Sequence, residues 1–194
     1  MISAVVLAAG ASVRMGAPKL LLPLGGEAMV RRTVRQVCDA GFDETVVVLG
    51  REPERTLAAL DGLPVRTVLN PDYASGMGTS FRVGMEAVHA SEAAMITLAD
   101  QPFVTTEAYR RVLDVYRQLR PAIVSVQYGD VTAPPHLFTR EFFPELAQLE
   151  HGARDLLRRH HARAHVLHLS PDLLMDIDTP DDYEAAKARL ASDR

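Results

Sequence analysis

The sequence predicts an α/β fold: a Rossmann-like three-layer α/β/α arrangement around a mostly parallel sheet. Short apolar runs alternate with longer segments of helical period, which is the pattern of βαβ units. Runs such as 45–49 consist almost entirely of β-branched and apolar residues, as expected of strands that are buried on both faces. The 194 residues contain no internal repeat, no low-complexity stretch and no linker, so we expect a single domain over residues 1–194.

The first two thirds of the chain predict five strands with helices between them. The expected strands are 3–8, 45–49, 64–69, 94–99 and 122–128. The expected helices are 29–40, 53–60, 79–89 and 105–119. Gly41 ends the first helix, and either Thr105 or Thr106 can cap the fourth.

The last third is less regular. Pro134-Pro135 breaks the pattern, and the run 136–138 that follows predicts a small antiparallel addition to the sheet. Short helices are expected at 142–149 and 153–160, followed by a strand at 164–169. A final helix is expected to begin with Thr179 as its N-cap and Pro180 at its first position.

Composition excludes several classes of function. The formal net charge is -4, whereas proteins that bind nucleic acid broadly usually present a basic face. One cysteine, Cys38, leaves no intrachain disulfide. No apolar run approaches the roughly 20 residues of a membrane span, and the N-terminus lacks a basic targeting segment. We therefore expect a cytoplasmic protein with no nucleic-acid or membrane partner.

A loop with two glycines and two basic residues follows the first strand. Gly10 and Gly16 allow backbone N–H groups to approach a phosphate, while Arg14 and Lys19 supply positive charge. The loop lacks the Gly-Lys-Ser/Thr of a Walker A motif and the Gly-x-Gly-x-x-Gly of a dinucleotide fingerprint. The alternative interpretation is an ordinary strand-to-helix turn.

Two further polar motifs follow expected strands, at the edge where open α/β sheets bind ligands. They are Asn70-Pro71 and Asp100-Gln101-Pro102. An acidic residue at the tip of a buried strand is costly without a partner, and Mg²⁺ is a natural partner beside a phosphate site. Asp100 is therefore a candidate metal ligand; the alternative is that it merely caps the following loop.

The segment 176–182 offers further carboxylates. Asp181 and Asp182 fall in the first turn of the final helix, where the helix dipole favours them structurally. Asp176 and Asp178 lie on the same side of an extended segment, and either can be the second metal ligand, with Asp178 preferred.

The segment 76–80 combines two glycines and two hydroxyl residues at a helix start. Such a segment can contact an anion or a base, although a plain capped helix start is the alternative. The seven histidines lack the spacing of a zinc site, and Ser12 lacks the Gly-x-Ser-x-Gly context of a hydrolase nucleophile.

Taken in order, these motifs resemble those of the MobA-like NTP transferases, in particular the molybdenum cofactor cytidylyltransferase branch. The matching segments are 7–19, 20–24, 70–71, 76–80, 98–102 and 176–180, which together span nearly the whole chain. The segment 129–138 departs from the glycine-rich turn of that branch, and its Ala133-Pro134-Pro135-His136 has no assigned role. The second substrate is expected near this departure.

The resemblance implies a Rossmann-like domain that binds an NTP and Mg²⁺. It assigns the triphosphate to Arg14 and Lys19, and the metal to Asp100, with Asp178 as the candidate second ligand. Arg14, Lys19 and Asp100 are the expected catalytic residues. The candidate nucleotide-binding residues are Leu7, Ala8, Ala9, Gly10, Ser12, Arg14, Lys19, Asn70, Gly76, Gly78, Thr79 and Ser80.

The implied reaction is transfer of CMP from CTP to the terminal phosphate of molybdopterin, with release of pyrophosphate. In this family the form Leu-Ala-Ala-Gly, present at 7–10, is associated with cytosine rather than guanine. A molybdoenzyme or its maturation chaperone is a possible partner. Two alternatives stay open: another phosphorylated acceptor such as a sugar or polyol phosphate, and a non-catalytic module that binds a nucleotide or cofactor.

Overall fold

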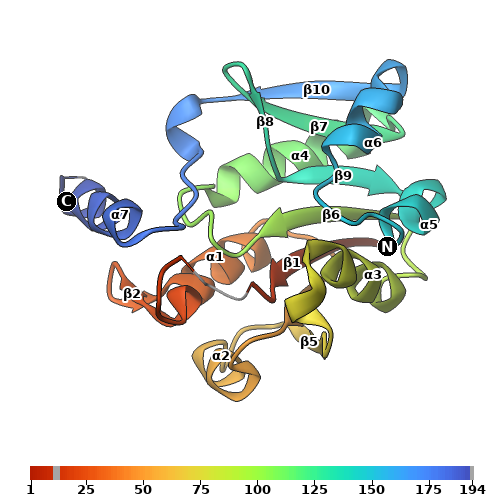
Figure 1. Cartoon of the computed structure of the whole chain (residues 1–194). Helices are drawn as coiled ribbons and strands as arrows, with labels where there is room; N and C mark the ends of the chain where they lie inside the picture. The colour runs from red at the N-terminus through yellow and green to blue at the C-terminus, as the bar shows by residue number, and fades with distance from the viewer. Residues whose placement is uncertain (11–13, 193–194) are drawn as a thin grey trace.

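A mixed sheet with helices on both faces forms the centre of the computed structural model, which describes residues 1–10 and 14–192 (Figure 1). Within these residues the strand order is β10-β7-β9-β6-β1-β4-β5, with β8 paired to β7. The strands are β1 Ile2–Ala8, β4 Glu44–Leu49, β5 Arg66–Leu69, β6 Ala93–Leu98, β7 Ile123–Tyr128, β8 Val131–Thr132, β9 His136–Thr139 and β10 Ala164–Leu169. The predicted fold class is confirmed.

The antiparallel part of the sheet lies at its centre. β9 pairs antiparallel with both β6 and β7, and β8 pairs antiparallel with β7, whereas the remaining pairs of the sheet are parallel. The sequence predicted this strand as an addition, without its position. Leu137 and Phe138 are fully buried in the cores on opposite faces of the sheet, which explains why β9 occupies an interior position.

Helices cover the two faces and create two apolar cores. Val6 of β1 packs in the core beneath α1 and α4, and its neighbour Val5 packs in the core beneath α3, α5 and α6. The helices are α1 Met29–Cys38, α2 Pro53–Ala59, α3 Met77–Ala87, α4 Thr106–Leu119, α5 Phe143–Leu146, α6 Arg154–Arg159 and α7 Pro180–Ser192. The three-layer arrangement follows from this alternation of apolar side chains.

Several short elements were not predicted. A hairpin of β2 (Pro23–Leu24) and β3 (Glu27–Ala28) precedes α1. Single 3₁₀ turns occupy Lys19–Leu21, Tyr73–Ser75, Arg140–Phe142, His161–Arg163 and Pro171–Leu173. The helix expected at 142–149 is wrong in length: α5 ends at Leu146, and the backbone then passes against α3, where the carbonyl of Glu150 accepts a hydrogen bond from the amide of Gly78.

Hydroxyl residues fix two helix starts. Thr105, rather than Thr106, caps α4, because its hydroxyl accepts a hydrogen bond from the amide of Ala108 at 3.3 Å. At α7 the hydroxyl of Thr179 accepts from the amide of Asp182, whose carboxylate accepts in return from the amide of Thr179 at 2.8 Å. The predicted cap of Thr179 and the structural role of Asp182 are both confirmed, and this cap holds the adjacent Asp178 in place.

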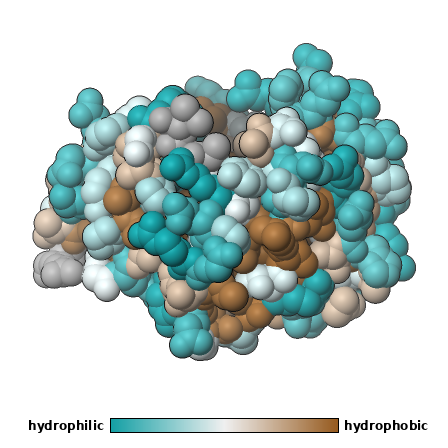
Figure 2. Space-filling view, turned by 60° about the horizontal axis from the view of Figure 1, so that its bottom comes forward, coloured by the Kyte–Doolittle hydropathy of each residue, from teal (hydrophilic) through white to brown (hydrophobic). Residues whose placement is uncertain are grey.

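The surface on the side of α2 and β5 is mostly polar, with apolar side chains grouped near the middle of the view (Figure 2). Large apolar residues exposed on these two elements are Leu57 of α2 and Leu69 of β5. Across the residues that the structure describes, every helix is too short or too polar to traverse a lipid bilayer.

Candidate active site

The predicted motifs meet at the carboxyl ends of the parallel strands. The amide of Ala99 donates to the carbonyl of Leu7, which joins the end of β6 to the end of β1. The amide of Ile177 donates to the carbonyl of Asp100 at 3.2 Å, which brings the 176–178 segment to the same edge. Segments that are far apart in the sequence therefore form one site.

Lys19 is at the centre of a cluster of charges at this edge. Its Nζ lies 2.7 Å from Asp100 Oδ2 and 2.7 Å from Asp178 Oδ1. The guanidinium of Arg14 donates to the other oxygen of Asp178, also at 2.7 Å. The Lys19 side chain is only 8% exposed, whereas that of Arg14 is 70% exposed. The structure thus brings together four of the predicted site residues.

The charges of this cluster support one another. Burial disfavours the ammonium of Lys19, but Asp100 and Asp178 outweigh burial and raise the Lys19 pKa above its usual value. Burial likewise disfavours the Asp178 carboxylate, but Lys19 and Arg14 outweigh it and lower the Asp178 pKa. Lys19 and Asp178 are therefore both ionised at neutral pH.

The same carboxylates suit a divalent metal ion. The carboxylates of Asp100 and Asp178 both contact the ammonium of Lys19, so an oxygen atom of each already lies 2.7 Å from one cation. The described residues include no group of three or more His, Cys, Asp or Glu side chains that could hold a metal. Two carboxylates fit Mg²⁺, which completes its octahedron with water and substrate phosphate oxygens.

A cavity of about 290 Å³ adjoins the charged cluster, and we call it the loop cavity. Its lining includes Leu7, Ala9, Gly10, Lys19, Leu20, Tyr73, Gly76, Met77, Ser80, Leu98 and Asp100. The side chain of Ala8 packs in the core on the other side of the sheet, so only its backbone is near the site. Ser12 lies outside the described residues.

Ala9 packs against Gly50, a residue that no sequence motif marked as part of the site. A Cβ atom on Gly50 would lie 2.6 Å from the carbonyl oxygen of Ala9, a distance that real side chains do not tolerate. Position 50 therefore has to be glycine for the end of β4 to approach this loop. Ala9 itself is only 4% exposed and borders the loop cavity.

Some of the predicted residues in the segment 70–80 line the loop cavity, and the others support the backbone around it. Gly76 and Ser80 line the loop cavity. Asn70 donates to the hydroxyls of Thr79 and Ser80, which fixes the start of α3. A Cβ on Gly78 would lie 2.0 Å from the carbonyl oxygen of Leu149, so this glycine allows helix packing instead of facing a ligand. α3 begins at Met77, two residues earlier than predicted.

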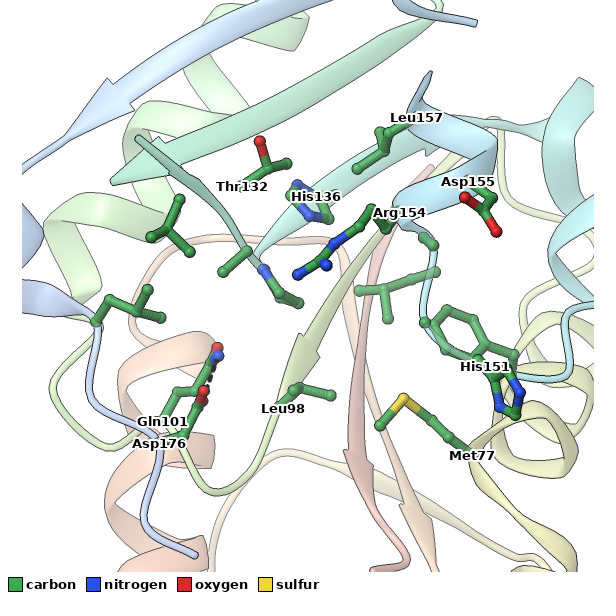
Figure 3. Close-up of a pocket in the computed structure, with 18 of the residues that line it drawn as sticks. Met77, Leu98, Gln101, Thr132, His136, His151, Arg154, Asp155, Leu157 and Asp176 are labelled. Carbon is green, nitrogen blue, oxygen red and sulfur yellow. Dashed lines mark hydrogen bonds between the residues drawn. The ribbon is translucent and has the colours of Figure 1, made fainter. Parts of the chain in front are cut away.

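A larger cavity of about 620 Å³ lies beside the loop cavity, and the two share Met77 and Leu98. We call it the β9 cavity, because β8, β9 and the turn between them form much of its wall. Its apolar lining includes Phe81, Ile96, Phe138, Leu157 and Leu174. Its polar lining includes Gln101, Thr132, His136, Arg154 and Asp176 (Figure 3).

Two buried polar side chains shape the β9 cavity. Gln101 is 1% exposed, and its Nε2 donates to Asp176 Oδ1 at 2.8 Å. The ring of His136 accepts a hydrogen bond at Nδ1 from the amide of Val126, and burial lowers the pKa of His136 to about 3. His136 is therefore neutral, with its proton on Nε2. Both residues are poised for hydrogen bonding rather than for ionic contacts.

These residues were the less predictable part of the site. In the sequence, Gln101 stands out only as a neighbour of Asp100, and His136 only as part of a segment with no predicted role. Each stands beside a proline next to a buried strand, Gln101 shortly after β6 and His136 at the first residue of β9, a signal that could have marked them. Asp176 was an alternative metal ligand, but its carboxylate pairs with Gln101, whereas Asp178 pairs with Lys19. No sequence signal indicated Arg154.

Characterised proteins of several activities are similar to this chain. A nicotine blue oxidoreductase of Paenarthrobacter nicotinovorans is 35% identical over 134 residues, which are 69% of this chain and 65% of that protein. A molybdenum cofactor cytidylyltransferase of Escherichia coli is 26% identical over 195 residues, covering 97% of this chain and 96% of that protein. The purine catabolism protein PucB of Bacillus subtilis is 29% identical over 206 residues and 96% of both chains.

Solved structures share the whole fold. Rv0371c of Mycobacterium tuberculosis is 33% identical with a TM-score of 0.83, over 97% of this chain and 98% of that chain. Its complex with manganese gives 32% identity and a TM-score of 0.74, over 96% and 98%. A nucleotidyl transferase from Methanothermobacter gives 25% identity and a TM-score of 0.86, over 100% and 99%. The MobA-like NTP transferase domain matches residues 4–165, and the chain belongs to this family of nucleotidyltransferases.

Proposed function

We propose that the protein is a Mg²⁺-dependent transferase that moves CMP from CTP to the terminal phosphate of molybdopterin and releases pyrophosphate. The observation that carries this proposal is the cluster of Lys19, Asp100 and Asp178 at the rim of the loop cavity. A charged cluster at the rim of one cavity, with a second cavity adjoining it, suits a reaction that joins two phosphorylated substrates. The full-length similarity to the E. coli cytidylyltransferase supports the choice of substrates.

The reaction needs little proton transfer. An oxygen of the acceptor's terminal phosphate attacks the α-phosphorus of CTP and forms a new P–O bond. The bond from the α-phosphorus to the bridging oxygen breaks, and pyrophosphate leaves with the electron pair. A phosphate monoester has a second pKa of about 6, so the attacking oxygen is already ionised near neutral pH. The enzyme's task is to bring two anions together and to offset their charge.

The residues of the loop cavity divide this task. Ala9 and Gly10 border the base, while Arg14 and Lys19 hold the triphosphate. Asp100 and Asp178 hold Mg²⁺, which when bound neutralises charge on the phosphoryl oxygens. Arg14 and Lys19 both pair with Asp178. Phosphate oxygens offer these cations other anionic partners, which leaves the carboxylates for the metal.

Because similar proteins carry several different names, the identity of the acceptor has to be tested. The alternative acceptor is a sugar or polyol phosphate, and the alternative to an enzyme is a non-catalytic module that binds a nucleotide or cofactor. The similarity to an oxidoreductase raises a third alternative, but the first loop of this chain lacks the dinucleotide fingerprint. In the proposed role, the product passes to a molybdoenzyme or its maturation chaperone in the cytoplasm.

Pyrophosphate release tests the proposal. The purified protein is assayed with each of CTP, GTP, UTP and ATP, with molybdopterin or a polyol phosphate as acceptor, and with Mg²⁺, Mn²⁺ or a chelator. We expect release with CTP and molybdopterin that requires the metal. Faster release of pyrophosphate with a polyol phosphate would identify that compound, instead of molybdopterin, as the acceptor. If no combination of nucleotide and acceptor releases pyrophosphate, the transferase proposal is rejected.

A further inference from the structure

The carbonyl oxygen of Gln101 is an unusual atom in the β9 cavity. Gln101 is 1% exposed, and its Oε1 is buried without a hydrogen-bond partner among the described residues. A buried polar atom left in this state is costly, on the order of 1–3 kcal/mol, and few occur in native proteins. A hydrogen-bond donor from outside the chain, either a ligand group or an ordered water, would satisfy this oxygen.

Asp176 fixes the direction of this oxygen. Because Nε2 of Gln101 donates to Asp176 Oδ1 at 2.8 Å, the amide cannot turn over without losing that bond. Figure 3 shows the two side chains side by side, joined by this hydrogen bond at one end of the cavity. Asp176 thus acts as a positioning residue for the amide of Gln101.

The walls of the cavity favour a flat ring over a polyol. Side chains such as Ile96, Phe138 and Leu157 leave most of the lining without hydrogen-bonding groups. A polyol carries a hydroxyl on nearly every carbon, and each hydroxyl would lose water against these walls. A planar heterocycle presents apolar faces and confines its polar groups to its edge.

We propose that Gln101 is a specificity-determining residue for the acceptor: its Oε1 accepts a hydrogen bond from an amino group on the edge of a planar heterocycle. This inference rests on the proposed function, since it treats the β9 cavity as the acceptor site. The Nε2–H of His136 provides a donor on another part of the wall, suited to a carbonyl or ring nitrogen of the same heterocycle.

Two ring systems that differ at one exocyclic group, and in the proton on the ring nitrogen beside it, provide the test. Pterin carries an exocyclic amino group where lumazine carries a carbonyl oxygen, and that oxygen would face Gln101 Oε1 without a proton between them. Binding of each is followed by the fluorescence of the ring, since the chain has no tryptophan to interfere. We expect the unsubstituted protein to bind pterin at least about tenfold more tightly than lumazine.

Substitutions connect this preference to one residue. Gln101→Leu should bring the two affinities within about twofold, and Asp176→Asn should reduce the preference in part. Gln148→Leu, at an exposed glutamine outside the cavity, is the matched control and should keep the full preference. In turnover assays Gln101→Leu should raise the KM for the acceptor and leave the KM for CTP unchanged, a split that a general structural defect would not produce. Gln101→Met serves if the leucine variant fails to fold.

The outcomes separate the two proposals. Equal affinity for both rings in the unsubstituted protein, failure to bind either ring, or a preference that survives Gln101→Leu would overturn the role of Gln101. If CMP transfer to molybdopterin is nevertheless observed, the proposed function stands without it. If the rings are discriminated through Gln101 but no pyrophosphate is released with molybdopterin, the proposed function fails while the cavity's specificity stands.

Discussion

The loop cavity and the β9 cavity share a wall at Met77 and Leu98, yet they depend on different physics. The loop cavity is bordered by ionised side chains that reach one another at 2.7 Å. Most residues that line the β9 cavity are apolar, and its polar lining combines a neutral histidine and an amide with one unsatisfied oxygen with the charged residues Arg154, Asp155 and Asp176. The first suits a polyphosphate and its metal, and the second suits an uncharged ring.

Adjacent residues supply both cavities. At the end of β6, Asp100 pairs with Lys19, and the next residue, Gln101, faces the β9 cavity. In the 176–178 segment, Asp178 pairs with Lys19 while Asp176 pairs with Gln101, and Ile177 between them is fully buried. This close connection means that, in the proposed reaction, backbone segments common to both cavities would align the two substrates, so variants of one cavity can be tested for effects on the other.

Removal of Lys19 should have the largest effect and should be confined to the loop cavity. Lys19→Ala deletes a preorganised cation, the kind of contact whose loss commonly costs about 100- to 1,000-fold in rate. The kcat for pyrophosphate release measures this loss, and pterin binding in the β9 cavity should be unchanged. Lys187→Ala, which removes an exposed lysine paired with Glu184 on α7, is the control. A folded Lys19→Ala protein with near-normal turnover would remove Lys19 from the catalytic site.

The next effect concerns the metal. Asp100→Asn keeps the size of the side chain but removes a charged oxygen ligand, so half-maximal activity should require at least about tenfold more Mg²⁺. A titration of activity against Mg²⁺ measures the shift. Asp181→Asn, at an exposed carboxylate in the first turn of α7, should leave the titration unchanged. Identical metal dependence in Asp100→Asn and its parent would leave Asp100 as a turn residue only.

The loop cavity was the more predictable of the two for a physical reason. Two glycines and both cations lie in the segment 10–19 that follows one strand, and Asp100 stands just beyond the tip of another buried strand. The β9 cavity is assembled from α3, β6, β8, β9, α6 and the 174–176 segment, and only the interior position of β9 brings them together. Strand order across a sheet depends on long-range packing, which local sequence patterns do not contain.

Close packing limited the prediction in the same way. Gly78 looked like part of an anion-binding turn, but its missing Cβ makes room for Leu149. Gly50, which makes room for Ala9, carried no signal because a glycine after a strand is common. The alternation of apolar runs with segments of helical period, by contrast, was enough to predict the fold class and most of the strands, and the Thr179-Pro180 pair was enough to predict the cap of α7.

Stability against acid tests the neutral character of the β9 cavity. Burial lowers the pKa of His136 to about 3, whereas an unfolded histidine titrates near 6.5. Between these values the unfolded chain binds a proton that the folded protein refuses, so the free energy of unfolding falls as pH falls, by up to about 1.4 kcal/mol per pH unit from this residue.

Urea unfolding at several pH values between 4 and 7 measures this contribution. His136→Gln should lose that part of the pH dependence, while His165→Gln, at an exposed position on β10, should retain it. The difference between the two variants isolates His136 from the carboxylates that also titrate in this range. If the free energies of unfolding of both variants change with pH in parallel, His136 takes up a proton in the folded protein as readily as in the unfolded chain.

The smallest expected effect concerns the choice of base in the loop cavity. Ala9 borders this cavity, is 4% exposed and is backed by Gly50, so its methyl group cannot retreat from a bound base. A purine needs more room than cytosine, and we expect CTP to be preferred over GTP. Ala9→Gly should relax this preference by less than about tenfold, the scale of one methyl group in a packed site. Competition kinetics give the ratio of kcat/KM for the two nucleotides, with Ala90→Gly, at an exposed position outside both cavities, as the control. Equal kcat/KM for CTP and GTP in the unsubstituted protein would show that Ala9 does not select the base.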